Sequence, residues 1–204
     1  CGTKFVRGML EDSRPQTFSD LVRISGFSHG TNVWLDNAQD LIKNGTCKLN
    51  EAISTRDDVM NFLIHRGMDR KHSFFVMENV RKGKGIEKRN KQGQATTEFE
   101  AEMRENNIPE WFIESCKKIS YLFPRAHAVA YVMMAFRIAW FKVYHPLAFY
   151  AAYFSIRAKA FDLRIMTGDL KTQMTEFNRI KALDRAASPK DKDLMSALEV
   201  SMEM

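Results

Sequence analysis

The sequence has few of the residues that are typical of loop-rich, fibrous or disulfide-stabilised proteins. Its 204 residues include 10 Gly, 5 Pro and 3 Cys. The cysteines Cys1, Cys47 and Cys116 are odd in number and form no CxxC pair, which argues against a disulfide scaffold and a structural zinc site. We expect them to be idle or buried thiols of a cytoplasmic protein.

The sequence also has no recognisable targeting signal. The first 30 residues contain no apolar signal core, and the chain starts with Cys rather than Met. This pattern indicates an internal piece of a longer protein rather than a secreted precursor. The longest uncharged apolar run, 126–136, is far shorter than the ~20 residues that span a bilayer, so we expect no membrane partner.

The composition is that of an ordinary globular protein with a modest positive charge. Hydrophobic residues make up 45% and charged residues 27%, which excludes wholesale disorder. Lys and Arg number 31 against 25 Asp and Glu, giving a formal net charge of +6. This charge permits a polyanionic partner but does not require one.

Helical signals dominate, and no alternating run predicts a strand, so we predict an all-α fold with short connecting loops. Capping boxes are expected at Thr17 and Thr97, and Thr55 is expected to cap a helix that ends at Gly67. The expected helices cover 18 to about 25, 34–43, 56 to about 66, 71–80, 98–105 and 109 to about 118.

The most apolar region, 126–156, is expected to form two helices that meet at Pro146 and to be the buried centre of the fold. An amphipathic helix over 163–183, broken near Gly168, and a last helix opened by Ser188 and Pro189 complete the prediction.

Three segments carry residues that could bind a phosphate-bearing ligand. The first is the turn Ser28-His29-Gly30-Thr31, which could present backbone N–H groups, a hydroxyl and an imidazole to an anion. The alternative is a plain helix-linking turn, with Gly30 at positive φ and Thr31 or Asn32 capping the next helix.

The second segment is the basic stretch 81–91, whose glycines do not match a P-loop. Arg81, Lys82 and Lys84 could grip phosphates, and the alternative is a solvated loop. We expect one basic flexible loop here, over 86–97.

The third segment places Arg125, His127 and Tyr131 at the start of the apolar helix. His127 and Tyr131 share a face, so they could stack a base beside a phosphate held by Arg125. The alternative is a satisfied core histidine and a packing tyrosine.

The sequence offers no catalytic or metal-binding centre. Asp57 and Asp58 are adjacent, so they point about 100° apart on a helix and are interpreted as first-turn helix acids. Neither a Ser-His-Asp pattern, nor HExxH, nor a dinucleotide fingerprint is present.

Long stretches of the sequence resemble one family. They are GTKFVRGML at 2–10, SHGTNVWLDNAQDLI at 28–42, RDDVMNFLIHRG at 56–67, VRKGKG at 80–85, PEWFIESCKKISYLFPRAHAVAYVMMAFRIAWFKVYHP at 109–146, and LEVSMEM at the end. In this order they resemble the PolC-type replicative DNA polymerases of low-GC Gram-positive bacteria, the alpha subunit class of DNA polymerase III. Phe27 and Asp36 stand where Leu and Gly are more usual in the family, and the loop 86–97 is longer.

The resemblance implies that residues 1–204 are the helical fingers region of a DNA-directed DNA polymerase. Residues 1–85 would lie on the nucleotide-pocket side, 86–97 would be the basic flexible loop, and 98–204 would be a helical core leading towards the duplex-binding region. The implied partners are primer-template DNA and dNTP, the palm and thumb of the same polymerase, and the sliding clamp and replisome. Mg²⁺ would be held by palm aspartates outside this chain, and the full-length protein would carry a 3′–5′ exonuclease.

The resemblance also implies roles for particular residues. The nucleotide and templating base would be bound by Ser28, His29, Gly30, Thr31, Arg125, His127 and Tyr131. Triphosphate or DNA-backbone contacts would come from Arg56, Arg66, Arg81, Lys82 and Lys84. Two alternatives remain open: a stand-alone helical nucleic-acid-binding domain, and a structural domain that docks another protein through its Met- and Phe-rich helices.

Overall fold

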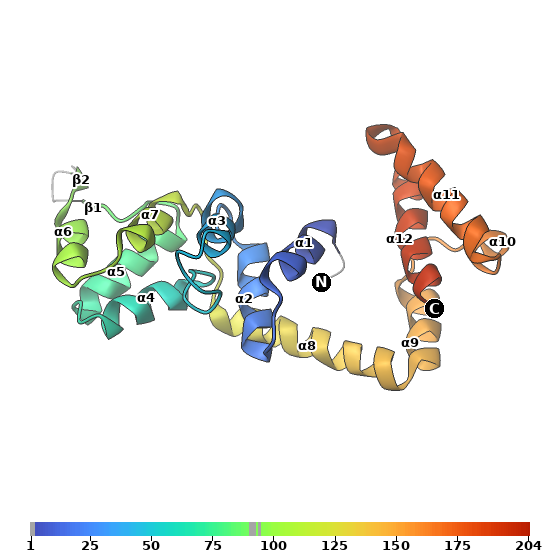
Figure 1. Cartoon of the computed structure of the whole chain (residues 1–204), viewed down its shortest axis with the longest axis horizontal. Coiled ribbons are helices and arrows are strands. Elements are labelled where there is room, and N and C mark those ends of the chain that lie inside the picture. Colours follow the sequence, from blue (N-terminus) through green and yellow to red (C-terminus); the bar gives the residue numbers. More distant parts are fainter. Residues whose placement is uncertain (1–2, 90–92, 94) are drawn as a thin grey trace. The chain divides into compact units, whose positions relative to one another are not determined.

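The computed structural model describes residues 3–89, 93 and 95–204. It divides into two compact units, Cys1–Ala135 and Phe136–Met204, whereas the sequence suggested subdivisions at 85/86 and 97/98. Helices dominate both units, which confirms the all-α class (Figure 1). Within the described part of the chain the strands are limited to the antiparallel two-residue pair β1 (Lys88–Arg89) and β2 (Ala95–Thr96).

The helices follow the predicted order closely. Those of the first unit are α1 (Lys4–Ser13), α2 (Phe18–His29), α3 (Gln39–Lys43), α4 (Arg56–His65), α5 (Arg70–Arg81), α6 (Glu98–Glu105) and α7 (Glu110–Lys118), and α8 (Arg125–Tyr144) runs from this unit into the second. The second unit adds α9 (Pro146–Ala152), α10 (Leu163–Met166), α11 (Leu170–Leu183) and α12 (Pro189–Glu203), with irregular turns at Trp34–Ala38, Tyr153–Arg157 and Asp184–Ala186.

Several helix starts form as the sequence predicts. Thr17 and Asp20 make a reciprocal capping box at α2, and Ser188 does the same at α12. At α4, the Asp58 carboxylate accepts hydrogen bonds from the backbone N–H and the hydroxyl of Thr55. The expected box at Thr97 is wrong, because its side chain makes no cap hydrogen bond and Glu100 pairs with other side chains instead.

Two helix boundaries differ from the prediction. Helix α2 does not stop near Gly26 but continues to His29, so half of the predicted 28–31 turn is helical. Gly26 serves close packing instead, since a Cβ there would lie 2.6 Å from the Ser54 carbonyl oxygen. The predicted helix over 34–43 begins only at Gln39, because Asp36 and its neighbours are non-helical, with Asp36 at φ 56°.

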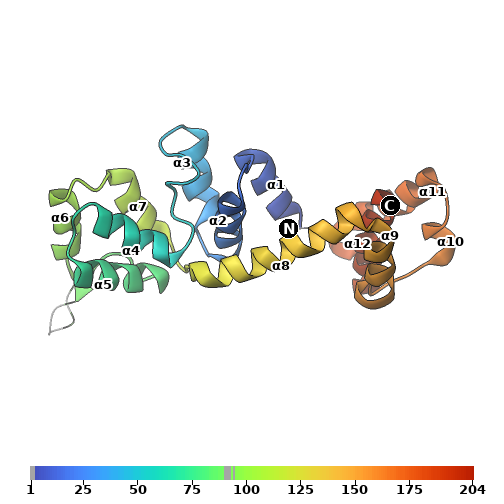
Figure 2. The same cartoon turned by 90° about the horizontal axis from the view of Figure 1, so that it is seen from below.

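The core of the first unit is built by side chains from α1, α2, α4, α5, α6 and α7. Phe27, Leu63 and Phe112 are fully buried in it, and α4 and α5 lie side by side in both views (Figures 1 and 2). The Phe27 and Trp34 ring centroids are 5.1 Å apart, so this position is part of the core.

Helix α8 is not the buried centre that the sequence predicts. Among its described residues only Ala128 and Val132 are buried, and they pack with Val22 of α2. Trp140 and many other apolar side chains of the helix are exposed. A helix that is apolar on all faces must be buried against other surfaces, but its sequence pattern does not say whether those surfaces belong to these 204 residues.

By length and composition alone, α8 is also apolar enough to cross a membrane, with a mean hydropathy of 1.2 over its best window. Arg137 and Lys142 interrupt it. The expectation that the protein has no membrane partner therefore stays a prediction.

The second unit has its own small core. Helices α11 and α12 pack together through Ile180, Ala197 and Leu198, with Met166 of α10 beside them. The predicted interruption of the helix near Gly168 and the predicted helix boundary at Pro146 are both confirmed. The predicted flexibility of the 86–97 loop falls partly on residues 90–92 and 94, which lie outside the described residues.

Candidate functional site

An extended segment between α7 and α8 links the 28–31 motif to the rest of the first unit. The Thr31 N–H donates to the Tyr121 carbonyl at 3.0 Å, and the Ser120 N–H donates to the Thr31 carbonyl at 3.0 Å. The Asn32 amide adds a hydrogen bond to the Ser120 hydroxyl at 2.9 Å. The 28–31 motif is therefore fixed against residues about 90 positions away in the chain.

The same segment also reaches two of the predicted cationic positions. The Leu122 N–H donates to the Arg81 carbonyl at 3.3 Å, and the Arg56 N–H donates to the Phe123 carbonyl at 3.0 Å. The end of α5 and the start of α4 are thus held on either side of this short strand-like segment. The 28–31 motif, Arg56 and Arg81 are distant in sequence, and all three are joined to this segment by backbone hydrogen bonds.

The 28–31 motif does not form an open anion cradle. The Gly30 N–H donates to Gly26, the Thr31 N–H donates to Tyr121, and the Ser28 hydroxyl donates to the Ser25 carbonyl at 2.9 Å. Gly30 has φ −80°, so the positive φ that belonged to the alternative, a plain helix-linking turn, is wrong. What the motif offers to a ligand is the exposed His29 ring and the exposed Thr31 side chain.

His29 joins the rings at the start of α8. Its ring centroid lies 5.4 Å from Phe123 and 6.5 Å from both His127 and Tyr131. The His127 and Tyr131 rings are 4.4 Å apart and 38° from parallel. The structure therefore brings together three side chains that the sequence assigned to one ligand, and His127 is only half-buried, unlike a core histidine.

Arg125 starts α8 beside two carboxylates of α4. Its backbone N–H donates to Asp57 Oδ2 at 2.7 Å, and its guanidinium lies 3.6 Å from Asp58 Oδ1. The same oxygen of Asp58 lies 3.5 Å from the Arg23 guanidinium. The Arg125 side chain stays 40% exposed, whereas those of Asp58 and Arg23 are almost buried.

The cations at the end of α5 are already paired. Arg81 Nη2 donates to Glu78 Oε2 at 2.9 Å, and Lys82 Nζ lies 2.9 Å from the same oxygen. The hydrogen bond from Arg81, followed by that from Lys82, lowers the pKa of Glu78 to about 2. Part of the positive charge predicted to grip phosphate is therefore neutralised within α5 and its C-cap.

Arg66 lies at the opposite end of α4 from Arg56. Its guanidinium carbon sits 5.3 Å from the Phe62 ring centroid, and Nη1 donates to the Asn107 carbonyl at 3.4 Å. A helix of ten residues is about 15 Å long, so Arg66 does not join the cluster around Arg125.

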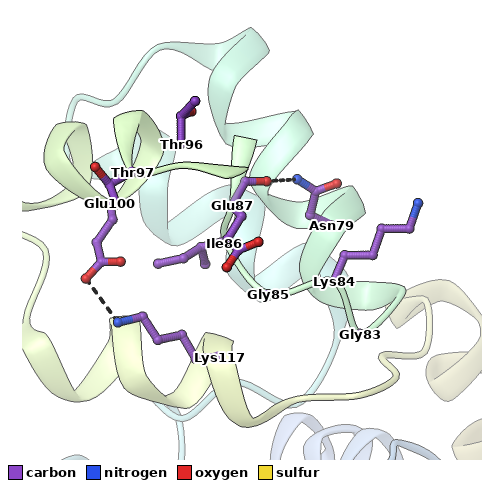
Figure 3. A pocket seen from close by; sticks show the side chains of 10 residues that line it. All are labelled: Asn79, Gly83, Lys84, Gly85, Ile86, Glu87, Thr96, Thr97, Glu100 and Lys117. Carbon is purple, nitrogen blue, oxygen red and sulfur yellow. Dashed lines mark hydrogen bonds and ion pairs between the residues drawn. The ribbon is translucent and has the colours of Figure 1, made fainter. Parts of the chain in front are cut away.

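Lys84 borders a pocket of about 900 Å³ between the 83–87 turn and helices α6 and α7. Figure 3 shows Lys117 aimed at Glu100, with 3.0 Å between Nζ and Oε1, while the Lys84 ammonium points away from that pair. Glu87 also lines the pocket, so its charges are mixed. It does not gather the lysines into one anion site.

The described part of the chain holds no cluster of three or more His, Cys, Asp or Glu suited to a metal ion. Cys47 and Cys116 are buried and free. Burial raises the pKa of the Cys47 thiol to about 11, so it stays protonated and unreactive near neutral pH.

Sequence reasoning missed the aromatic residues just before α8. Phe123 lies 4.7 Å from His127 and 5.5 Å from Tyr121, measured between ring centroids. A usable signal was present, since Pro124 disfavours helix before it, and residues two apart on an extended segment point to the same side. It also missed the part played by Asp57 and Asp58, which hold the start of α8 as well as that of α4.

Comparison with known proteins identifies the family. The sequence model described as "Bacterial DNA polymerase III alpha subunit finger domain" matches residues 1–107. The DNA polymerase III PolC-type proteins of Thermotoga maritima, Caldanaerobacter subterraneus subsp. tengcongensis and Bacillus subtilis are 56%, 55% and 53% identical to this chain. These alignments cover 100% of the chain but only 14% of each relative's length.

The helical fold and the matched residues define the class of bacterial polymerase finger domains. Within it, the chain belongs to the PolC-type DNA polymerase III family, which confirms the resemblance seen in the sequence.

Proposed function

We propose that this finger domain binds the incoming deoxynucleoside triphosphate and the templating base during template-directed nucleotidyl transfer by a DNA-directed DNA polymerase. The observation that supports this most is the gathering of His29, His127 and Tyr131, with the partly exposed Arg125 as the first residue of the helix that carries two of these rings. Aromatic rings stack on nucleobases, and a guanidinium binds phosphate oxygens in a bidentate manner.

In this proposal Arg125 contacts the triphosphate. Asp57 fixes the Arg125 backbone through its hydrogen bond. The 3.6 Å separation between the guanidinium and Asp58 is long enough for the guanidinium to leave Asp58 for a phosphate. A positioned cation stabilises charge on a transferring phosphoryl group, and closure of the fingers would deliver it.

His127, Tyr131 and His29 contact the nucleobases, as stacking surfaces and hydrogen-bond donors. Ser28, Gly30 and Thr31 act indirectly, because their hydrogen bonds fix the position of the His29 ring. The structural support for nucleotide binding therefore comes from rings and guanidinium rather than from backbone N–H groups.

Arg56 and Arg81 are the strongest candidates for contacts to the template backbone, since both flank the segment that carries the rings. Lys82, Lys84 and Arg66 are weaker candidates. Lys82 shares Glu78 with Arg81, Lys84 borders the mixed-charge pocket, and Arg66 lies at the far end of α4.

The chain would not catalyse alone. The described residues offer no metal cluster, so we assign no step to Mg²⁺ here and propose that it is held by palm aspartates of the full-length polymerase. The further partners in the proposal are the thumb, the sliding clamp and the replisome, in a cytoplasmic enzyme that also carries a 3′–5′ exonuclease.

The test is steady-state kinetics of the full-length polymerase with Arg125→Ala. Loss of a charged hydrogen bond costs about 1.5–3 kcal/mol, so kcat/KM for dNTP should fall roughly 10- to 150-fold, through a higher KM or a lower kcat. Arg70→Ala, at an exposed arginine that starts α5, is the control and should behave like wild type. Unchanged kinetics with all four nucleotides would remove Arg125 from the site.

DNA binding by the 204-residue chain separates this function from that of a stand-alone nucleic-acid-binding domain. That alternative requires the 204-residue chain alone to bind DNA with a steep salt dependence. Affinity no higher than that of a neutral protein in ~100 mM salt, where phosphate-driven binding still registers, would reject it.

A further inference from the structure

The rings around His127 continue beyond the residues assigned to the nucleotide. Following the centroids, Tyr121 lies 5.5 Å from Phe123, Phe123 lies 4.7 Å from His127, and His127 lies 4.4 Å from Tyr131. We call these four residues the ring row. It runs from the extended segment before α8 to the second turn of that helix.

The two ends of the ring row are open to solvent. Tyr121 is 40% exposed and Tyr131 is 59% exposed, whereas Phe123 and His127 between them are half-buried. The ring row therefore offers two separate positions on which a base could stack, one at Tyr121 and one at Tyr131. The Tyr131 end belongs to the nucleotide in the proposed function, which leaves the Tyr121 end without an assigned ligand.

The Tyr121 end is held rigidly. Its carbonyl accepts the Thr31 N–H, the Arg81 carbonyl accepts the Leu122 N–H, and the Phe123 carbonyl accepts the Arg56 N–H. Each of three consecutive residues is therefore hydrogen-bonded to a different part of the first unit. A rigid aromatic surface loses little conformational entropy when a ligand stacks on it.

The surroundings of the Tyr121 end favour an anionic strand. Arg81 and Arg56 are joined to the segment by backbone hydrogen bonds to Leu122 and Phe123, and Arg125 follows it directly in the chain. The acids that face these cations are Glu78, Asp57 and Asp58. The Arg81 and Arg125 side chains keep 26% and 40% of their surface exposed despite these pairs, so each can still reach a phosphate oxygen.

We propose that Tyr121, backed by the half-buried Phe123, forms a stacking site for unpaired bases of single-stranded DNA, next to but separate from the nucleotide position at Tyr131. Stacking on an aromatic ring accepts any base, since every base has a π-face. The site would therefore bind the unpaired strand without sequence preference. This inference relies on the proposed function only in that the domain faces DNA.

The test measures binding by the full-length polymerase, without dNTP, of three fluorescein-labelled primer-templates. One has an unpaired four-base 5′ overhang, one has the same overhang made of abasic residues, and one is blunt. From the usual strength of base–aromatic stacking, Tyr121→Ala should weaken binding of the first roughly 5- to 150-fold. Binding of the abasic and blunt duplexes should not change.

Two further variants keep the result interpretable. Tyr121→Phe retains the ring and should bind like wild type, whereas Tyr121→Leu retains apolar bulk without the ring and should resemble the alanine variant. Phe74→Ala removes an equally exposed aromatic ring from the early part of α5 and should have no effect.

Equal loss for all three DNAs would contradict stacking, because the abasic and blunt DNAs have no unpaired base to stack on Tyr121. No loss with Tyr121→Ala would contradict the inference and make Tyr121 purely structural. The outcome is independent of the Arg125→Ala kinetics: normal dNTP kinetics of Arg125→Ala, together with weakened overhang binding by Tyr121→Ala, would remove Arg125 from the nucleotide site and leave this inference standing.

Discussion

Asp58 lies in the first turn of α4 with its side chain only 10% exposed. One oxygen accepts hydrogen bonds from the backbone and hydroxyl groups of Ser54 and Thr55, and the other faces the guanidinium groups of Arg23 and Arg125. The sequence predicts only a first-turn helix acid here. The side chain in fact ties α2, α4 and α8 together.

We expect Asp58→Asn to destabilise the chain. An amide of the same shape removes the negative charge and leaves two guanidinium groups, one of them almost buried, without their shared carboxylate. The free energy of unfolding should fall by about 3 kcal/mol in urea titrations. Asp40→Asn, at an exposed first-turn acid of α3, should change it by no more than about 0.5 kcal/mol. Equal stability of the two variants would contradict the role of Asp58.

Asp36 illustrates a residue whose family difference has a local explanation. Its φ of 56° and ψ of 16° lie in the left-handed region, where glycine is the usual residue and aspartate is tolerated. The conformation fits the expectation, drawn from the resemblance, that Gly is more usual at this position. It also explains why the helix predicted over 34–43 begins late, since hydrophobic spacing contains no information on a left-handed residue.

At the scale of elements, most helix boundaries were predictable, whereas the burial of a helix was not. The caps at Thr17 and Ser188 depend on residues within four positions, so the sequence contains the whole interaction. The continuation of α2 past Gly26 depends on contact with Ser54, which is distant in the chain. The exposure of α8 depends on which surfaces are available to cover it.

The C-terminal end of α5 should respond to acid through Glu78. Its carboxyl pKa is lowered from 4.5 to about 2, so the paired form contributes stability above pH 4.5 and loses it as the pH falls towards 2. Because the pair is partly solvated, we expect about 1–2 kcal/mol rather than the full value of the shift.

The measurement is the free energy of unfolding of wild type and Glu78→Gln between pH 6 and pH 2. Wild type should be the more stable above pH 4.5, and the difference should vanish near pH 2. Glu11→Gln, on the exposed surface of α1, should follow wild type throughout. A constant difference between wild type and Glu78→Gln across the range would show that the ion pair is not its source.

At the scale of the molecule, the candidate site could be predicted as residues but not as an assembly. The sequence pointed to His29, Arg125, His127 and Tyr131, and the structure gathers the three rings and pairs Arg125 with Asp58. The segment that joins them to Arg56 and Arg81 works through backbone hydrogen bonds, which any residue type can make. Backbone contacts of this kind cannot be predicted from composition or from the spacing of residue types.

The exposure of apolar side chains on the second half of α8 also has an explanation at the scale of the whole molecule. Trp140 is 46% exposed and Phe141 is 51% exposed, and neighbouring apolar side chains are exposed as well. Contiguous apolar surface of this kind marks a contact with another surface. The chain spans only 14% of the length of its PolC-type relatives, so we expect other domains of the full-length polymerase to cover this helix.

Oxidative footprinting read by mass spectrometry can test that cover on tryptophan side chains. Trp140 should be oxidised rapidly in the 204-residue chain and several-fold more slowly in the full-length polymerase, because burial removes the indole from solvent. Trp34, only 3% exposed within the first-unit core, should be protected in both proteins and serves as the internal reference. Equal oxidation of Trp140 in the two proteins would mean that α8 keeps its apolar surface free for a separate partner.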